Sequence, residues 1–161
     1  MKYRSLSLEE LESLKTDFIK FLAANTITSD DWEKLKRDQA EKAEQLIAIF
    51  SDMVFDQTLE KVTYLEHKTP RSIRTYHCLP DKISLMGLLV EGETALNFTQ
   101  NLSPEQMINL VQLSGAELKL FSGEKAYKTD RKLEIFELME QGALISKDGH
   151  LFHTLHQLKQ T

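Results

Sequence analysis

The sequence has very little cysteine, proline and glycine, and it has no long apolar run. Cys78 is the single cysteine among 161 residues, so no internal disulfide can form and a reducing compartment is expected. Three prolines and six glycines leave no low-complexity linker. No apolar run approaches the roughly 18–20 residues that cross a bilayer, and the acidic start MKYRSLSLEELESL lacks the apolar core of a signal peptide. We therefore expect a soluble cytoplasmic protein.

The formal net charge is −5, but acidic and basic residues are unevenly distributed. Residues 1–60 carry 13 acidic against 8 basic side chains, whereas residues 61–90 carry 5 basic against 2 acidic ones. Affinity for nucleic acid comes mostly from neutralising phosphates, so an acidic chain is not a general nucleic-acid binder. Only the basic middle segment would meet phosphate at low electrostatic cost.

The first sixty residues have the pattern of a helical hairpin. Ser7-Leu8-Glu9-Glu10 is a capping box, and apolar residues then recur at helical spacing to about Ala24. A second helix start follows at Thr28, and the apolar stripe continues to about Leu59. Residues 28–60 therefore form one long helix or two helices with a bend.

Strand patterns replace the helical ones after Lys61. Three segments have strand composition, at residues 62–66, 72–78 and 83–90, and residues 96–99 are a candidate for a further short strand. The third segment is nearly all apolar, as expected of a central strand that is covered on both faces. Gly87 inside it suggests a bulge or a close approach of another chain segment.

The last sixty residues predict two helices and two stretches of strand. Ser103-Pro104-Glu105-Gln106 begins a helix that ends near Gly115, and a strand at residues 117–121 precedes a turn at Ser122-Gly123. Thr129 is placed to cap a second helix. That helix is apolar except for a narrow strip, so neighbours must cover it on two sides; the strip consists of Glu134, Glu137 and Gln141.

A β-hairpin is expected after this helix. Asp148-Gly149 is a strong two-residue turn signal, which would set Ile145 opposite Phe152. The fold class is therefore α+β: an N-terminal helical hairpin, a mainly antiparallel sheet with two packed helices, and a C-terminal β-hairpin. We expect one domain over residues 1–161, with a helical arm at 1–60 and a sheet-containing part at 61–161.

No catalytic or metal constellation emerges from the sequence. His150, His153 and His156 lack the ligand spacing of a known zinc site, and no cofactor is expected. His77 and Cys78 are adjacent in a predicted strand and point to opposite faces, so they do not form a nucleophile and base. Cys78 is better interpreted as a small buried apolar residue.

Two groups of basic residues are the candidate binding sites. The first lies at the start of the predicted second helix, where exposed backbone amides also favour anions, and comprises Lys125, Lys128, Arg131 and Lys132. The second lies on the basic middle strands, where arginine and aromatic side chains can bind a partner's carboxylates, and comprises Lys68, Arg71, Arg74 and Tyr76. The alternative for both groups is a solvated surface.

Three segments carry a resemblance to a known family: MKYRSLSLEELESL with DFIKFLAANTITSDDWEKL, then YLEHKTPRSIRTYHC, and KAYKTDRKLEIFELMEQGALIS. The chain resembles an uncharacterised bacterial family, catalogued as a domain of unknown function, over almost its whole length. The family has no established activity or cofactor, so no functional residues are carried over. The resemblance implies a small soluble single-domain bacterial protein.

The leading hypothesis is a non-enzymatic protein that docks onto a larger partner, such as a transcription or translation complex. Lys68, Arg71, Arg74 and Tyr76 would then be interface residues. One alternative is an enzyme or small-ligand binder whose pocket is lined by His67, His77 and the Lys125–Lys132 cluster. Another alternative is nucleic-acid binding through the basic strands. The sequence predicts no membrane association and does not specify the oligomeric state.

Overall fold

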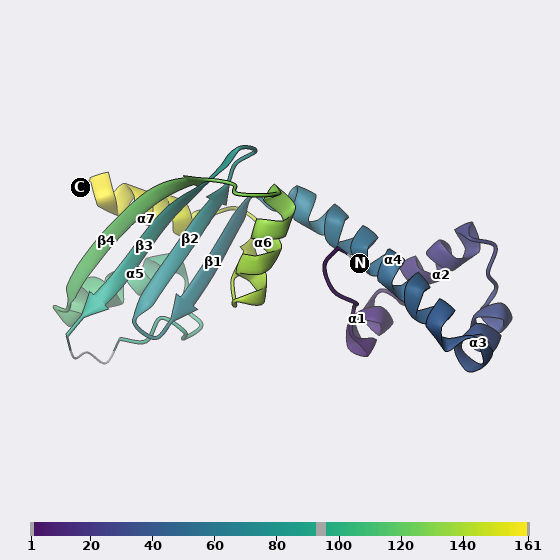
Figure 1. Cartoon of the computed structure of the whole chain (residues 1–161). Helices are drawn as coiled ribbons and strands as arrows, with labels where there is room; N and C mark the ends of the chain where they lie inside the picture. Colours follow the sequence, from purple (N-terminus) through teal and green to yellow (C-terminus); the bar gives the residue numbers. More distant parts are fainter. Residues whose placement is uncertain (1, 93–95, 161) are drawn as a thin grey trace. The chain divides into compact units, whose positions relative to one another are not determined.

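The computed structural model describes residues 2–92 and 96–160 of the chain, which fall into two compact units (Figure 1). The first unit comprises Met1–Glu60 and the second Lys61–Thr161. No helix among the described residues has both the length and the apolar character needed to span a membrane.

Four helices form the N-terminal unit: α1 (Leu8–Ser13), α2 (Lys15–Ala24), α3 (Ser29–Asp38) and α4 (Ala40–Lys61), whose last residue lies beyond the boundary. Both predicted capping boxes are present: the Ser7 and Thr28 hydroxyls accept hydrogen bonds from the amides of Glu10 and Asp31. The helix expected to run to Ala24 is interrupted at Leu14, and the segment 28–60 is divided at Gln39.

An aromatic cluster forms the core of this unit. The ring of Phe18 stacks on Phe50 at 5.0 Å between centroids and meets Trp32 edge-on at 5.1 Å. Leu6 and Leu22 are buried beside them. Burial of these rings, together with aromatic pair energies of about 0.5–1.5 kcal/mol each, stabilises a unit whose individual helices are short.

The C-terminal unit contains an antiparallel five-stranded sheet in the order β4-β3-β2-β1-β5 (Figure 1). The strands are β1 (Tyr64–Thr69), β2 (Ser72–Cys78), β3 (Lys82–Glu91), β4 (Glu117–Ala126) and β5 (Leu144–Ser146). The nearly all-apolar segment is the central strand β3, as predicted. Together with the helices of both units, the sheet confirms the α+β class.

Two strand predictions are wrong. The chain does not turn at Ser122-Gly123; these residues pair with Met86 and Leu85, because β4 continues as the partner of β3 over all ten residues. Residues 96–99 form no strand. Instead the amide of Phe98 donates to the carbonyl of Pro70 at 3.1 Å and its ring is buried, so this segment covers the end of the sheet.

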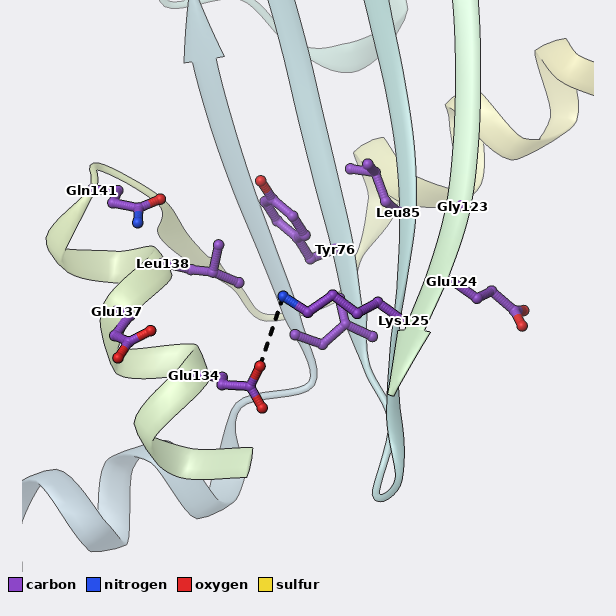
Figure 2. A pocket seen from close by; sticks show the side chains of 10 residues that line it. Tyr76, Leu85, Gly123, Glu124, Lys125, Glu134, Glu137, Leu138 and Gln141 are labelled. Carbon is purple, nitrogen blue, oxygen red and sulfur yellow. Dashed lines mark ion pairs between the residues drawn. The ribbon is translucent and has the colours of Figure 1, made fainter. Parts of the chain in front are cut away.

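Helices pack on both faces of the sheet. Helix α5 (Pro104–Ser114) and helix α7 (His150–Gln160) lie on one face, where Met107 of α5 and Leu155 of α7 join the core with Ile73, Met86 and Leu88 of the strands. Helix α6 (Arg131–Glu140) lies on the opposite face, beside β1 and β2 (Figures 1 and 2). We call these the α7 face and the α6 face.

The predicted C-terminal hairpin is wrong in its second half. The first strand forms, as β5, but it pairs with β1, setting Ile145 beside Leu65, and Phe152 lies in helix α7. Gly149 has the positive φ of +65° that suits a turn, and Tyr64 packs against it so closely that a Cβ would lie 2.6 Å from the ring.

The residues after Gly149 follow helical rather than strand spacing. Leu151, Phe152 and Leu155 recur on one side of a helix and are buried in the sheet core. The Asp148 carboxylate accepts the amide of His150 at 3.0 Å, and the carbonyl of Gly149 accepts the amide of His153 at 3.0 Å. The glycine turn therefore begins a helix, because burial of these three side chains favours it.

Candidate functional site

The register of the strands fixes which side chains share the α6 face. Alternate residues of each strand point to it, in rows that cross the sheet. One row runs His67–Arg74–Gly87–Phe121, and the next runs Thr69–Ser72–Leu89–Lys119. Two further rows, Leu65–Tyr76–Leu85–Gly123 and Cys78–Ile83–Lys125, lead towards α6.

The rows away from α6 form an exposed surface, which we call the open face: Arg74, Leu89, Lys119 and Phe121. Arg74 and Lys119 are exposed and make no hydrogen bond or ion pair with the rest of the described chain. Leu89 is 38% exposed, and the ring of Phe121 covers Gly87. Two cations whose charge is not neutralised thus flank an apolar centre.

A pocket of about 420 Å³ lies next to the open face, between α6 and the sheet (Figure 2). Its apolar lining comes from Ile83 and Leu85 of β3, Leu138 of α6 and the ring of Tyr76. Its polar lining comes from Gln141, Lys125, Glu134 and Glu137, and the strip expected on α6 therefore faces this pocket. Glu124 also borders the pocket, but its side chain points away from it (Figure 2).

The charged pair inside the pocket is loosely held. The Lys125 ammonium lies 3.8 Å from Oε1 of Glu134, and the amide of Thr129 donates to Oε2 at 3.4 Å. Both separations exceed the 2.7–2.9 Å of a strong charge-assisted hydrogen bond. Glu134 is only 8% exposed, so a carboxylate with weak contacts is buried at the pocket wall.

The four residues predicted to bind a partner do not lie together. Lys68 pairs with Ile73, the neighbour of Arg74, so Lys68 and Arg74 point to opposite faces. Lys68 also forms an ion pair with Glu66 at 3.8 Å, and Arg71 donates to the carbonyl of Gly92 in the turn region. Only Arg74 and Tyr76 share the α6 face. The expectation that these cations face outward together is therefore corrected.

The predicted anion-binding cluster is also divided. Lys125 points into the pocket, whereas Lys128 is exposed after the end of β4. The guanidinium of Arg131 donates to the carbonyls of Val62 at 2.5 Å, Cys78 at 3.0 Å and Leu79 at 3.2 Å. Arg131 therefore binds strand ends together. Lys132, its neighbour on α6, is half-buried and has interactions of its own.

The two histidines of the predicted alternative pocket are separated by the sheet. His67 lies on the α6 face, close to Gly142, while His77 lies on the α7 face, stacked on Tyr64 at 4.5 Å. Neither lines the pocket beside α6. The shared pocket suggested for His67, His77 and the lysine cluster is therefore not formed by these residues.

Titratable groups elsewhere in the sheet are held by packing. Burial, with a smaller effect of His153, lowers the pKa of His77 below its ordinary value. Burial raises the pKa of Cys78 to about 11, opposed by the nearby Arg131, so this thiol is a poor nucleophile near neutral pH. Among the described residues, no three or more His, Cys, Asp or Glu side chains converge as metal ligands would.

Sequence reasoning missed the pocket, although one of its signals was visible. A helix that is apolar on most sides but keeps a strip of Glu134, Glu137 and Gln141 either exposes that strip to bulk water or turns it into a cavity. Choosing between these needs the position of Lys125 on β4, which the expected turn at Ser122-Gly123 placed outside the sheet.

Comparison with known proteins gives a family but no activity. The model of one family, described as a family of unknown function (DUF6495), matches residues 1–160. No curated protein and no solved structure matches the chain.

Proposed function

We propose that the chain, which belongs to the family of unknown function DUF6495, is a non-enzymatic protein that docks onto a larger protein partner through the open face. The occupant that suits this face is an acidic segment with an apolar residue at its centre. The proposal places the protein in the bacterial cytoplasm and puts a transcription or translation complex first among the classes of partner.

Charge complementarity is the observation that supports this proposal. Arg74 and Lys119 lie in adjacent rows on either side of the apolar Leu89 and Phe121, and neither cation is neutralised within the described chain. A partner's carboxylates would satisfy both cations, while its apolar side chain would cover Leu89. The lateral position of Lys68 on the other face leaves no continuous basic track of the kind that tracks phosphates.

Affinity purification combined with zero-length cross-linking tests the proposal. Tagged full-length protein is purified from its source cells after treatment with a carbodiimide, which joins a lysine to a carboxylate in direct contact. We expect an amide bond between Lys119 and an Asp or Glu of one partner protein. We also expect the variant Arg74→Glu with Lys119→Glu to recover about tenfold less of that partner.

A charge-matched variant controls for non-specific effects. Lys68→Glu with Lys147→Glu changes the net charge equally but lies outside the open face, so recovery should be unchanged. Unaltered recovery with the open-face variant would refute the docking surface. Loss of the captured material after nuclease treatment would instead assign the contact to nucleic acid and overturn the proposal.

A further inference from the structure

The pocket beside α6 combines an apolar wall with an excess of negative charge. Ile83, Leu85 and Leu138 supply the wall. Glu134 and Glu137 bring two carboxylates, against one ammonium from Lys125. Glu124 does not enter this balance, because it points away from the pocket and pairs with Lys82 at 3.1 Å. A ligand with one positive charge would therefore neutralise the pocket.

The chain already presents an alkylammonium to this pocket. The side chain of Lys125 extends from β4 across the pocket towards α6, with its ammonium directed at Glu134 (Figure 2). Its side chain remains 59% exposed, and the separation of 3.8 Å is long for a direct hydrogen bond. Lys125 is thus a weakly held internal cation that an external one can displace.

We propose that this pocket binds an organic monocation, an alkylammonium or alkylguanidinium. The hydrocarbon part lies against Leu85 and Leu138, and the cationic group replaces Lys125 at the carboxylate of Glu134. About 420 Å³ accommodates such a ligand without movement of the sheet. The cation comes either from a free small amine or from a lysine or arginine side chain of another protein. This inference does not depend on docking at the open face.

Binding is measured on the isotopically labelled full-length chain by NMR titration. The probes are n-hexylammonium chloride and the methylamide of Nα-acetyl-lysine, with hexanoate and 1-hexanol as controls of similar size. We expect saturable shifts of the amides of Gly123 and Leu138 with the cationic probes, and at least about tenfold weaker binding of the anion and the alcohol. The tighter of the two cationic probes identifies the source of the cation.

The variant Lys125→Ala separates this proposal from binding of an anion or zwitterion. Removing the internal cation should tighten binding of hexylammonium by about threefold to tenfold, whereas a site for carboxylates would lose affinity. Glu134→Gln should weaken binding about tenfold. Glu137→Gln, at an exposed position, serves if the buried substitution impairs folding, and should weaken binding less.

Two results would overturn the inference. The first is hexanoate binding as tightly as hexylammonium to the wild-type chain. The second is weaker binding of hexylammonium by Lys125→Ala, because a displaced internal cation can only compete. Failure of both cationic probes to bind at millimolar concentration would have the same consequence.

Discussion

The ring of Phe121 lies directly against Gly87, its partner on the neighbouring strand. A Cβ added at Gly87 would lie 2.1 Å from Cζ of Phe121. The ladder continues without interruption on both sides of this pair, so the glycine marks a close approach and not a bulge. An aromatic ring that covers a glycine on the adjacent strand shields the exposed backbone and fills the space left by the missing side chain.

This contact predicts a reversal of sign in a double-mutant cycle. Gly87→Ala should destabilise the wild-type protein by about 1–3 kcal/mol, because the ring of Phe121 must move away. In a Phe121→Ala background the same change should stabilise by about 0.5 kcal/mol, since alanine restricts the unfolded chain more than glycine does. Urea unfolding of the four proteins measures both values. Additive effects would show that the ring does not occupy this position in solution.

Arg131 is predicted to be a structural residue. Its guanidinium donates to three carbonyls, those of Val62, Cys78 and Leu79, and Arg131→Met would leave them without this donor. We expect a loss of about 2–4 kcal/mol in the free energy of unfolding. Arg131→Lys should recover only part of it, because a single ammonium cannot reproduce the planar fork. Lys128→Met, at a nearby exposed position, is the matched control and should change stability by less than about 0.5 kcal/mol.

The N-terminal unit should lose stability in acid through Glu10. Two hydrogen bonds from Arg4, at 2.8 and 3.1 Å, and one from the amide of Ser7 lower the pKa of Glu10 from 4.5 to about 2. Since the folded pKa is the lower one, the stabilisation is present above pH 4.5 and is lost as the pH falls towards 2. Both side chains are more than a third exposed, so we expect only about 1 kcal/mol.

Far-UV circular dichroism during urea unfolding, between pH 7 and pH 2, measures this effect. Glu10→Gln should remove the contribution at neutral pH and flatten its share of the acid dependence. Glu9→Gln changes the same charge in the same helical turn but has no such contacts, and should behave as the wild type. Equal behaviour of the two variants would contradict the assignment to Glu10.

His77 should give the sheet unit a separate pH dependence. Burial lowers its pKa, so the unfolded chain takes up a proton first as the pH falls through 6.5. Stability should therefore decrease with falling pH from about 6.5 down to the lowered pKa, by at most about 1.4 kcal/mol per pH unit. His77→Phe keeps a ring against Tyr64 and Phe152 and should flatten this slope. Urea unfolding at pH 5.5, 6.5 and 7.5 provides the comparison, and an unchanged slope would exclude His77 as its source.

Short-range signals in the sequence predicted helix starts well, because a cap is complete within four residues. Ser7, Thr28 and Ser103 each accept the expected amide hydrogen bond. The Asp148-Gly149 signal failed for a related reason. A glycine with positive φ suits a hairpin and a helix start equally, and burial of Leu151 and Leu155 in a distant core decided between them.

The site could not be predicted at the same level, because the face of a strand residue depends on the preceding turn. The connection between β1 and β2 sets Thr69 opposite Ser72, and this register places Lys68 and Arg74 on different faces. A turn longer by one residue would exchange the faces of the second strand. Basic composition alone therefore indicated cations in the sheet, but not which of them share a surface.

The position of β4 at the border of the sheet affects how the protein behaves at high concentration. Ten residues of this strand pair with β3 on one side only, in the order that the sheet adopts. Such a border is a template for stacking of identical chains. Lys119 interrupts the apolar stretch from Leu118 to Phe121, and Glu117 and Glu124 add charge on either side of it. These side chains act as gatekeepers against fibre formation, so neutralising them would lower solubility even where the native fold is unharmed.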